Sequence, residues 1–151
     1  MERFESTVMK TKRGAYYFDI PQKIMKEFNL RPFMAGRMRA GKKGLIISDF
    51  EKTVKIKADL KKKDIEMIRK IMKEEGYGSI DETISNVLHR IFEPKKEDSV
   101  VYIYPEGFLN SKFTLINDYQ KYVKKKKSGS KNSEKKQKKR KKRGKAKWTT
   151  I

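Results

Sequence analysis

Lysine and arginine are the residues of this sequence whose number and spacing could do chemistry, and that chemistry is phosphate binding. The 151 residues include 40 Lys and Arg against 19 Asp and Glu, which gives a formal net charge of +21. Residues 1–50 carry a net charge of +6, residues 51–120 a net charge of zero, and residues 121–151 a net charge of +15. Basic blocks that are segregated in this way are typical of nucleic-acid-binding proteins.

Residues for catalysis are sparse. The sequence has one histidine, His89, and no cysteine, so no His/Cys metal cluster and no Ser/His or Cys/His pair is supported. His89 falls beside the apolar stripe of a predicted helix, which favours a surface position. Neighbouring acids are adjacent in sequence and therefore point in different directions. The sequence predicts no enzyme, no cofactor and no metal.

Hydropathy gives no sign of a membrane protein. No apolar run approaches the roughly 20 residues that span a bilayer. The first residues lack the apolar stretch of a signal peptide. We therefore expect a cytoplasmic, nucleoid-associated protein with no membrane partner.

Residues 1–50 are predicted to form a small domain of strands with one short helix. Aromatic and β-branched residues on both sides of Gly14 favour two strands. Pro21 favours the start of a helix that ends near Phe28. Glycines at 41 and 44 favour a hairpin turn into a last strand at 45–48.

This order of elements resembles the AbrB/MazE/SpoVT swapped-hairpin family, in its archaeal form, over residues 6–48. The resemblance rests on Gly-Ala-Tyr-Tyr-Phe-Asp-Ile-Pro at 14–21, on Phe-Asn-Leu at 28–30, and on Gly36. It implies an interleaved homodimer in which two hairpins exchange strands into a small β-barrel that binds DNA. One departure is Arg37, since the family usually has an acidic residue there.

The same resemblance implies that basic residues around the first loop and the second strand face DNA. These are Lys10, Lys12 and Arg13, with Arg37 and Arg39 as weaker candidates.

Residues 51–97 are predicted to form a strand followed by two helices. Residues 53–59 alternate apolar and polar side chains, as in a half-buried strand. An apolar stripe predicts a helix over 63–75, which glycine at 76 ends. Ser79 and Glu82 form a capping box for a second helix that buries four apolar residues and stops before Pro94: Ile84, Val87, Leu88 and Ile91.

This unit resembles the ribbon-helix-helix family of CopG- and Arc-like repressors over residues 53–93. The resemblance implies that strands of two chains pair into a ribbon in the major groove, where Thr53, Lys55 and Lys57 face the bases. It also implies that the backbone at Ser79 and Ile80 meets a phosphate. The alternative is that the unit serves only for dimerisation or packing.

Residues 98–123 are predicted to form a strand, a turn and a further strand or short helix that packs in the core or at an interface. Residues 124–151 are predicted to form a disordered tail, since they are nearly all basic or small and polar. Such a tail binds phosphates without reading sequence. Its candidate contacts are Lys138, Lys139, Arg140, Lys141, Lys142 and Arg143.

The sequence therefore predicts an α+β protein in which a swapped-hairpin dimer module precedes a strand-helix-helix unit and a basic tail. The expected function is that of a dimeric DNA-binding regulator of transcription, of archaeal or archaeal-virus type. Three alternatives stay open. They are an architectural or packaging protein of chromatin or a virion, an RNA-bound or ribosome-associated protein, and an antitoxin with a toxin partner.

Overall fold

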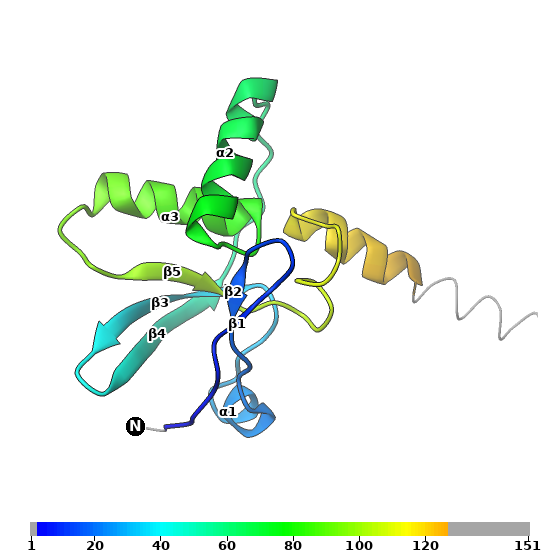
Figure 1. Ribbon diagram of the computed structural model, residues 1–151. Coiled ribbons are helices and arrows are strands. Elements are labelled where there is room, and N and C mark those ends of the chain that lie inside the picture. Colours follow the sequence, from blue (N-terminus) through cyan, green and yellow to red (C-terminus); the bar gives the residue numbers. More distant parts are fainter. Residues whose placement is uncertain (1–2, 127–151) are drawn as a thin grey trace, which may run out of the picture. The chain divides into compact units, whose positions relative to one another are not determined.

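The computed structural model describes residues 3–126, and its architecture is α+β, as the sequence predicted (Figure 1). Two small antiparallel sheets and four helices make up the described chain. One compact unit ends at Ile116, and a second begins at Asn117. The two units are described separately below.

The chain begins with a short hairpin and a helix. Strand β1 (Met9–Lys10) pairs with β2 (Tyr16–Tyr17), and the turn between them places Gly14 at φ +89°. Helix α1 (Gln22–Glu27) follows Pro21 directly, where the sequence predicted a helix start.

A three-stranded sheet follows, in the order β4-β3-β5. The long hairpin of β3 (Met34–Gly41) and β4 (Gly44–Lys52) forms at the predicted glycine turn and extends beyond the predicted strand. Strand β5 (Ser99–Tyr102) pairs with the first half of β3. The region 98–123 thus begins with the strand predicted for it, and this strand joins the sheet of the first fifty residues.

Two helices lie between β4 and β5 in the chain. Helix α2 (Lys62–Glu75) ends at Gly76, whose φ of +77° is left-handed. A Cβ at Gly76 would also lie 2.3 Å from the Tyr16 ring. Both the positive φ and this close approach therefore favour glycine at position 76. Helix α3 (Ile80–Phe92) is capped by Ser79, whose Oγ accepts a hydrogen bond from the Glu82 N–H, as the capping box predicted.

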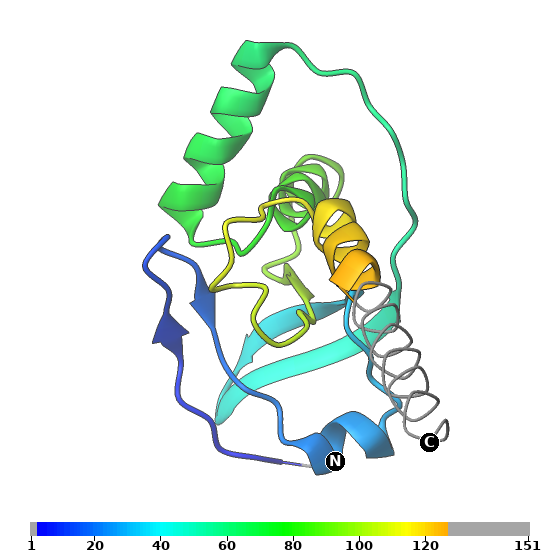
Figure 2. The ribbon, with the colours of Figure 1, turned by 90° about the vertical axis from the view of Figure 1, so that its right-hand side faces the viewer.

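Residues 53–61 differ from the prediction because they have no regular secondary structure (Figure 2). The strand expected over 53–59 is wrong for the single chain, because a strand needs a neighbour to pair with and this segment has none. The described residues also form no closed barrel: their sheets have two and three strands.

The core is small and lies where the first hairpin, the start of α3 and the segment 103–116 meet. Five apolar residues are buried in the described chain, namely Ala15, Ile80, Ile103, Phe108 and Ile116. The rings of Tyr104 and Phe108 stack with their centroids 5.0 Å apart. A core of this size gives little hydrophobic stabilisation to a unit of this length.

In the second unit, residues 117–126 are helical. Two tyrosines on this helix, Tyr119 and Tyr122, have ring centroids 6.4 Å apart, and the Lys126 ammonium lies 5.4 Å from the Tyr122 ring. The tail contacts predicted at Lys138 to Arg143 lie outside the described residues.

Candidate nucleic-acid interface

The connection between β4 and α2 is the most basic stretch of the described chain that is exposed throughout. We call residues 52–63 the lysine segment. It contains six lysines and only one acidic residue, Asp59. Every residue from 51 to 64 is exposed. The lysines are Lys52, Lys55, Lys57, Lys61, Lys62 and Lys63.

The apolar residues of the lysine segment are exposed as well. Val54 is 85% exposed and Ile56 is 78% exposed, although their alternation with lysines is that of a half-buried strand. Thr53 is tethered to the sheet, because its hydroxyl donates to the Phe33 carbonyl at 3.0 Å. The segment therefore has the sequence of a paired strand and the exposure of an unpaired one.

The first loop places its three predicted contacts in different surroundings. Lys12 is exposed, and the Lys10 ammonium lies 5.2 Å from the Tyr16 ring. Arg13 donates to the carbonyls of Phe113 at 3.0 Å and Leu109 at 3.3 Å. Burial lowers the pKa of Arg13 from its ordinary value. Arg13 thus holds the segment 109–113 in place, and its replacement would disturb the fold as well as any binding.

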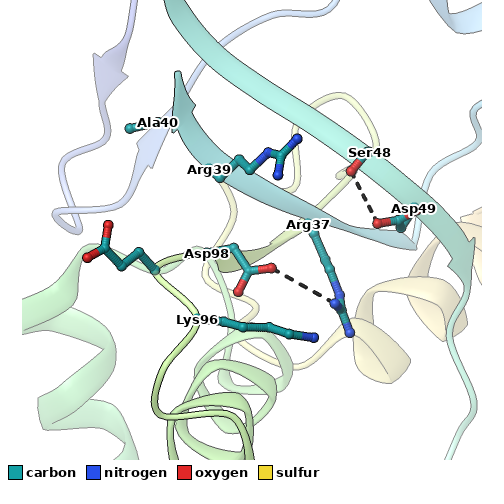
Figure 3. A pocket seen from close by; sticks show the side chains of 8 residues that line it. Arg37, Arg39, Ala40, Ser48, Asp49, Lys96 and Asp98 are labelled. Carbon is teal, nitrogen blue, oxygen red and sulfur yellow. Dashed lines mark hydrogen bonds and ion pairs between the residues drawn. The ribbon is translucent and has the colours of Figure 1, made fainter. Parts of the chain in front are cut away.

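Arg37 and Arg39 line a pocket of about 460 Å³ beside the sheet (Figure 3). Arg37 lies 3.6 Å from a Glu93 oxygen and 4.0 Å from an Asp98 oxygen, so two carboxylates engage it. Arg39 is exposed. Lys96 and three acids also line the pocket, so its charges balance; the acids are Asp49, Glu97 and Asp98.

His89 contacts the same two acids as Arg37 and is not the surface residue that the sequence favoured. Its side chain is 9% exposed, with Nε2 2.5 Å from Asp98 and Nδ1 3.0 Å from Glu93. The Lys96 ammonium lies 2.9 Å from the other Glu93 oxygen, and this hydrogen bond is the main cause that lowers the pKa of Glu93. The contacts of His89 join the end of α3 to the start of β5.

The N-terminus of α3 is closed to a phosphate, so that expectation is wrong. Ser79 and Ile80 are 0% and 3% exposed. The Ile80 N–H donates to the Thr114 carbonyl at 2.8 Å, and the Glu82 N–H donates to Ser79 Oγ. The N–H groups of Ile80 and Glu82 therefore form hydrogen bonds within the protein.

Helix α3 buries polar side chains, and the predicted apolar stripe is only partly covered: Ile84 and Val87 are half-buried, whereas Leu88 and Ile91 are exposed. The side chains that it buries in the turns after Ile80 are Glu82, Thr83 and Asn86. Asn86 donates to the Val100 carbonyl and accepts from the Val100 N–H, both at 2.9 Å, which fixes α3 along β5. We call Leu88, Ile91 and Phe92 the apolar face of α3; they are 48%, 63% and 77% exposed.

The buried Glu82 carboxyl is the most perturbed acid of the described chain. Its Oε2 accepts from the Gly78 N–H at 3.0 Å and from the Tyr104 hydroxyl, which lies 3.0 Å from Ser79 Oγ. Burial raises the pKa of Glu82 to about 7, against the lowering effect of the hydrogen bonds from Tyr104 and Gly78. Glu82 thus ties the α2–α3 turn to the chain that follows β5.

Comparisons with protein-family models, with curated proteins and with solved structures gave no match for this chain. The resemblances of residues 6–48 and 53–93 stay predictions. Within residues 3–126, no helix has the length and apolar character needed to cross a membrane. The same residues hold no group of His, Asp and Glu side chains suited to a metal ion.

Sequence reasoning named Lys55 and Lys57 but passed over the other lysines of their segment. The net charge of zero for residues 51–120 concealed the local excess at 52–63. The run Lys61–Lys63 is the signal that a shorter window would have found. Lys42 and Lys43, at the tip of the β3–β4 hairpin, were missed for a different reason, because the glycines beside them marked only a turn.

Proposed function

We propose that this chain is a dimeric DNA-binding protein that regulates transcription. The observation that carries the proposal is the lysine segment, which is exposed, basic and patterned as a strand without a partner. Lysines at alternate positions are suited to the phosphates and base edges of a groove, and a two-stranded ribbon fits the major groove of B-DNA.

The partner of the lysine segment is a second copy of the same segment. Antiparallel pairing of two copies would place Val54 and Ile56 of both chains on one face of a ribbon and Lys55 and Lys57 on the other. The apolar face would then pack against the helices, and the lysine face would stay free for DNA. The ribbon-helix-helix resemblance implies the same arrangement.

The exposed apolar surface of the helices supports the dimer. Leu88, Ile91 and Phe92 of α3 are exposed, as is Met67 of α2 at 63%. An amphipathic helix that buries its polar side leaves its apolar side for another molecule. The small core of residues 3–116 also favours a dimer, since association would add buried apolar area.

The swapped-hairpin resemblance implies a second dimer contact. It implies that β1–β4 of two chains interleave into a closed barrel. The basic tail at 124–151 would add affinity through counterion release and would lack sequence preference.

An architectural or packaging protein is the second candidate. The observation that favours it is the charge of residues 121–151, +15 with one acid, which attracts any duplex alike. The regulator of transcription remains the first candidate, because residues 6–48 and 53–93 both resemble units of sequence-specific regulators.

We predict that Lys55→Glu with Lys57→Glu weakens the binding of duplex DNA. If each lysine meets a phosphate, the slope of log K against log salt becomes shallower by about 2 per chain. The measurement is a titration of a labelled duplex with the full-length protein at several salt concentrations between about 50 and 200 mM, where phosphate contacts are strongly salt-dependent.

The matched control for this pair is Lys23→Glu with Lys26→Glu on α1. Both lysines are exposed, and the change in net charge is identical. A slope equal to that of the control would show that the lysine segment does not contact DNA. Loss of helical circular dichroism in the lysine-segment variant alone would assign the effect to folding.

A further inference from the structure

The β3–β4 hairpin projects beyond the rest of its sheet. Strand β5 pairs with β3 from Ala35 to Met38, whereas β4 pairs with β3 as far as Gly41. The end of the hairpin therefore has no third strand beside it. In Figure 1 the end of the hairpin diverges from β5. We call residues 39–44 the hairpin tip.

The hairpin tip is basic and carries no acid. Arg39, Lys42 and Lys43 are exposed, and residues 38–48 contain no Asp or Glu. Within the described part of the chain, no ion pair or hydrogen bond engages these three cations, whereas the nearby Arg37 and Lys96 are both paired with Glu93. Lys42 and Lys43 lie outside the charge-balanced pocket that Arg39 lines, so the hairpin tip presents a stronger positive charge to an anion than that pocket does.

The turn concentrates this charge at a narrow end. Lys42 and Lys43 are the only residues between the paired glycines Gly41 and Gly44. Gly44 has a φ of +146°, and a Cβ at Gly41 would lie 3.1 Å from the Gly44 carbonyl oxygen, so the two strands close tightly. The two lysines thus stand at the apex of a slender two-stranded projection.

The hairpin tip also lies far from the lysine segment. The lysine segment starts at Lys52, which pairs with Met34 at the opposite end of the hairpin. Seven residue steps separate Met34 from Gly41 along β3, which corresponds to about 23 Å. One ligand that meets both sites must therefore carry anionic groups spread over that distance, as the two phosphate rows of a duplex do.

We propose that the hairpin tip is a second contact with duplex nucleic acid, in which Arg39, Lys42 and Lys43 bind backbone phosphates. This inference rests on the proposed function, and it names a surface separate from the lysine segment. The contact positions the protein on the duplex without reading bases, because it consists of flexible cations at a turn.

The test compares full-length wild-type protein with Lys42→Glu plus Lys43→Glu, in a titration of a 30-base-pair duplex of mixed sequence, a length of about three helical turns. We expect weaker binding and a salt slope that is shallower by about 2 per chain. The pair Lys42→Arg plus Lys43→Arg should keep the wild-type slope, because it keeps the charges. The control is again Lys23→Glu plus Lys26→Glu.

Each outcome decides a separate claim. A hairpin variant whose slope equals that of the control overturns this inference, and if the lysine-segment variant is still weakened, the proposed function stands. A wild-type protein that does not bind duplex DNA overturns both. A hairpin variant that binds DNA normally but loses binding to a single-stranded RNA of equal charge overturns the choice of duplex DNA as the ligand.

Discussion

Leu88→Glu with Ile91→Glu is expected to separate the dimer into folded monomers. These side chains are 48% and 63% exposed in the single chain, so their replacement leaves its core intact. In the dimer each would gain burial worth about 1 kcal/mol, which for four side chains amounts to about a thousandfold in the dissociation constant. Sedimentation equilibrium over a range of protein concentrations measures this constant.

The matched control is Leu115→Glu, because Leu115 is 40% exposed and lies outside β1–β4, the lysine segment and the apolar face of α3. We expect this control to stay dimeric. Monomeric wild-type protein at concentrations near 100 times those used for DNA binding would contradict the dimer. A double variant that unfolds would show that α3 needs its apolar face within the single chain.

The free energy of unfolding is expected to fall as the pH rises from about 5 to about 7, and Glu82 is the cause. Its pKa is raised from 4.5 to about 7 in the folded chain, mainly by burial, so folding favours the protonated carboxyl. The stabilisation is complete below the unfolded pKa and is lost as the pH passes the folded pKa. The difference corresponds to about 3 kcal/mol.

Glu82→Gln tests this pH dependence because it mimics the protonated acid. The amide oxygen can still accept from Tyr104 and Gly78, as Glu82 Oε2 does. We expect urea denaturation of this variant to give nearly the same stability at pH 5 and pH 7.5. Glu66→Gln, at an exposed position of α2, should keep the wild-type decline. A Glu82→Gln profile that follows the wild type would assign the decline to other groups.

Local signals in the sequence were sufficient to predict the helices and the long hairpin. Pro21, Gly76 and the pair of Ser79 and Glu82 each act within a few residues of the helix end that they determine. The glycines of the β3–β4 turn act equally locally. Such signals are independent of the rest of the chain, which is why these elements form where they were expected.

The packing of α3 could not be predicted in the same way. The spacing of Ile84, Leu88 and Ile91 identifies an apolar face, but it does not say whether that face meets the same chain or another. The polar face is buried because Asn86 matches both backbone groups of Val100, fourteen residues away. That match depends on tertiary contacts, and no periodicity reveals it.

The candidate interface was predictable in its residue types and less so in its geometry. Alternation predicted a strand at 53–59, although pairing needs a neighbour that one chain lacks. Arg13 was assigned to DNA by resemblance, whereas its guanidinium contacts two carbonyls about a hundred residues away. A long-range contact of this kind leaves no trace in the local sequence. The lysine run at 61–63, by contrast, can be found in a short sequence window, although the net charge of the whole region conceals it.

The number of chains bound to one short duplex tests the central claim most directly. We would mix full-length protein with a limiting 20-base-pair duplex, selected from genomic fragments for binding, at about 200 mM salt, where contacts through charge alone weaken. Analytical ultracentrifugation would then give the mass of the complex. The account predicts a single complex of two chains per duplex. One chain per duplex, or a mass that rises steadily as protein is added, would contradict it.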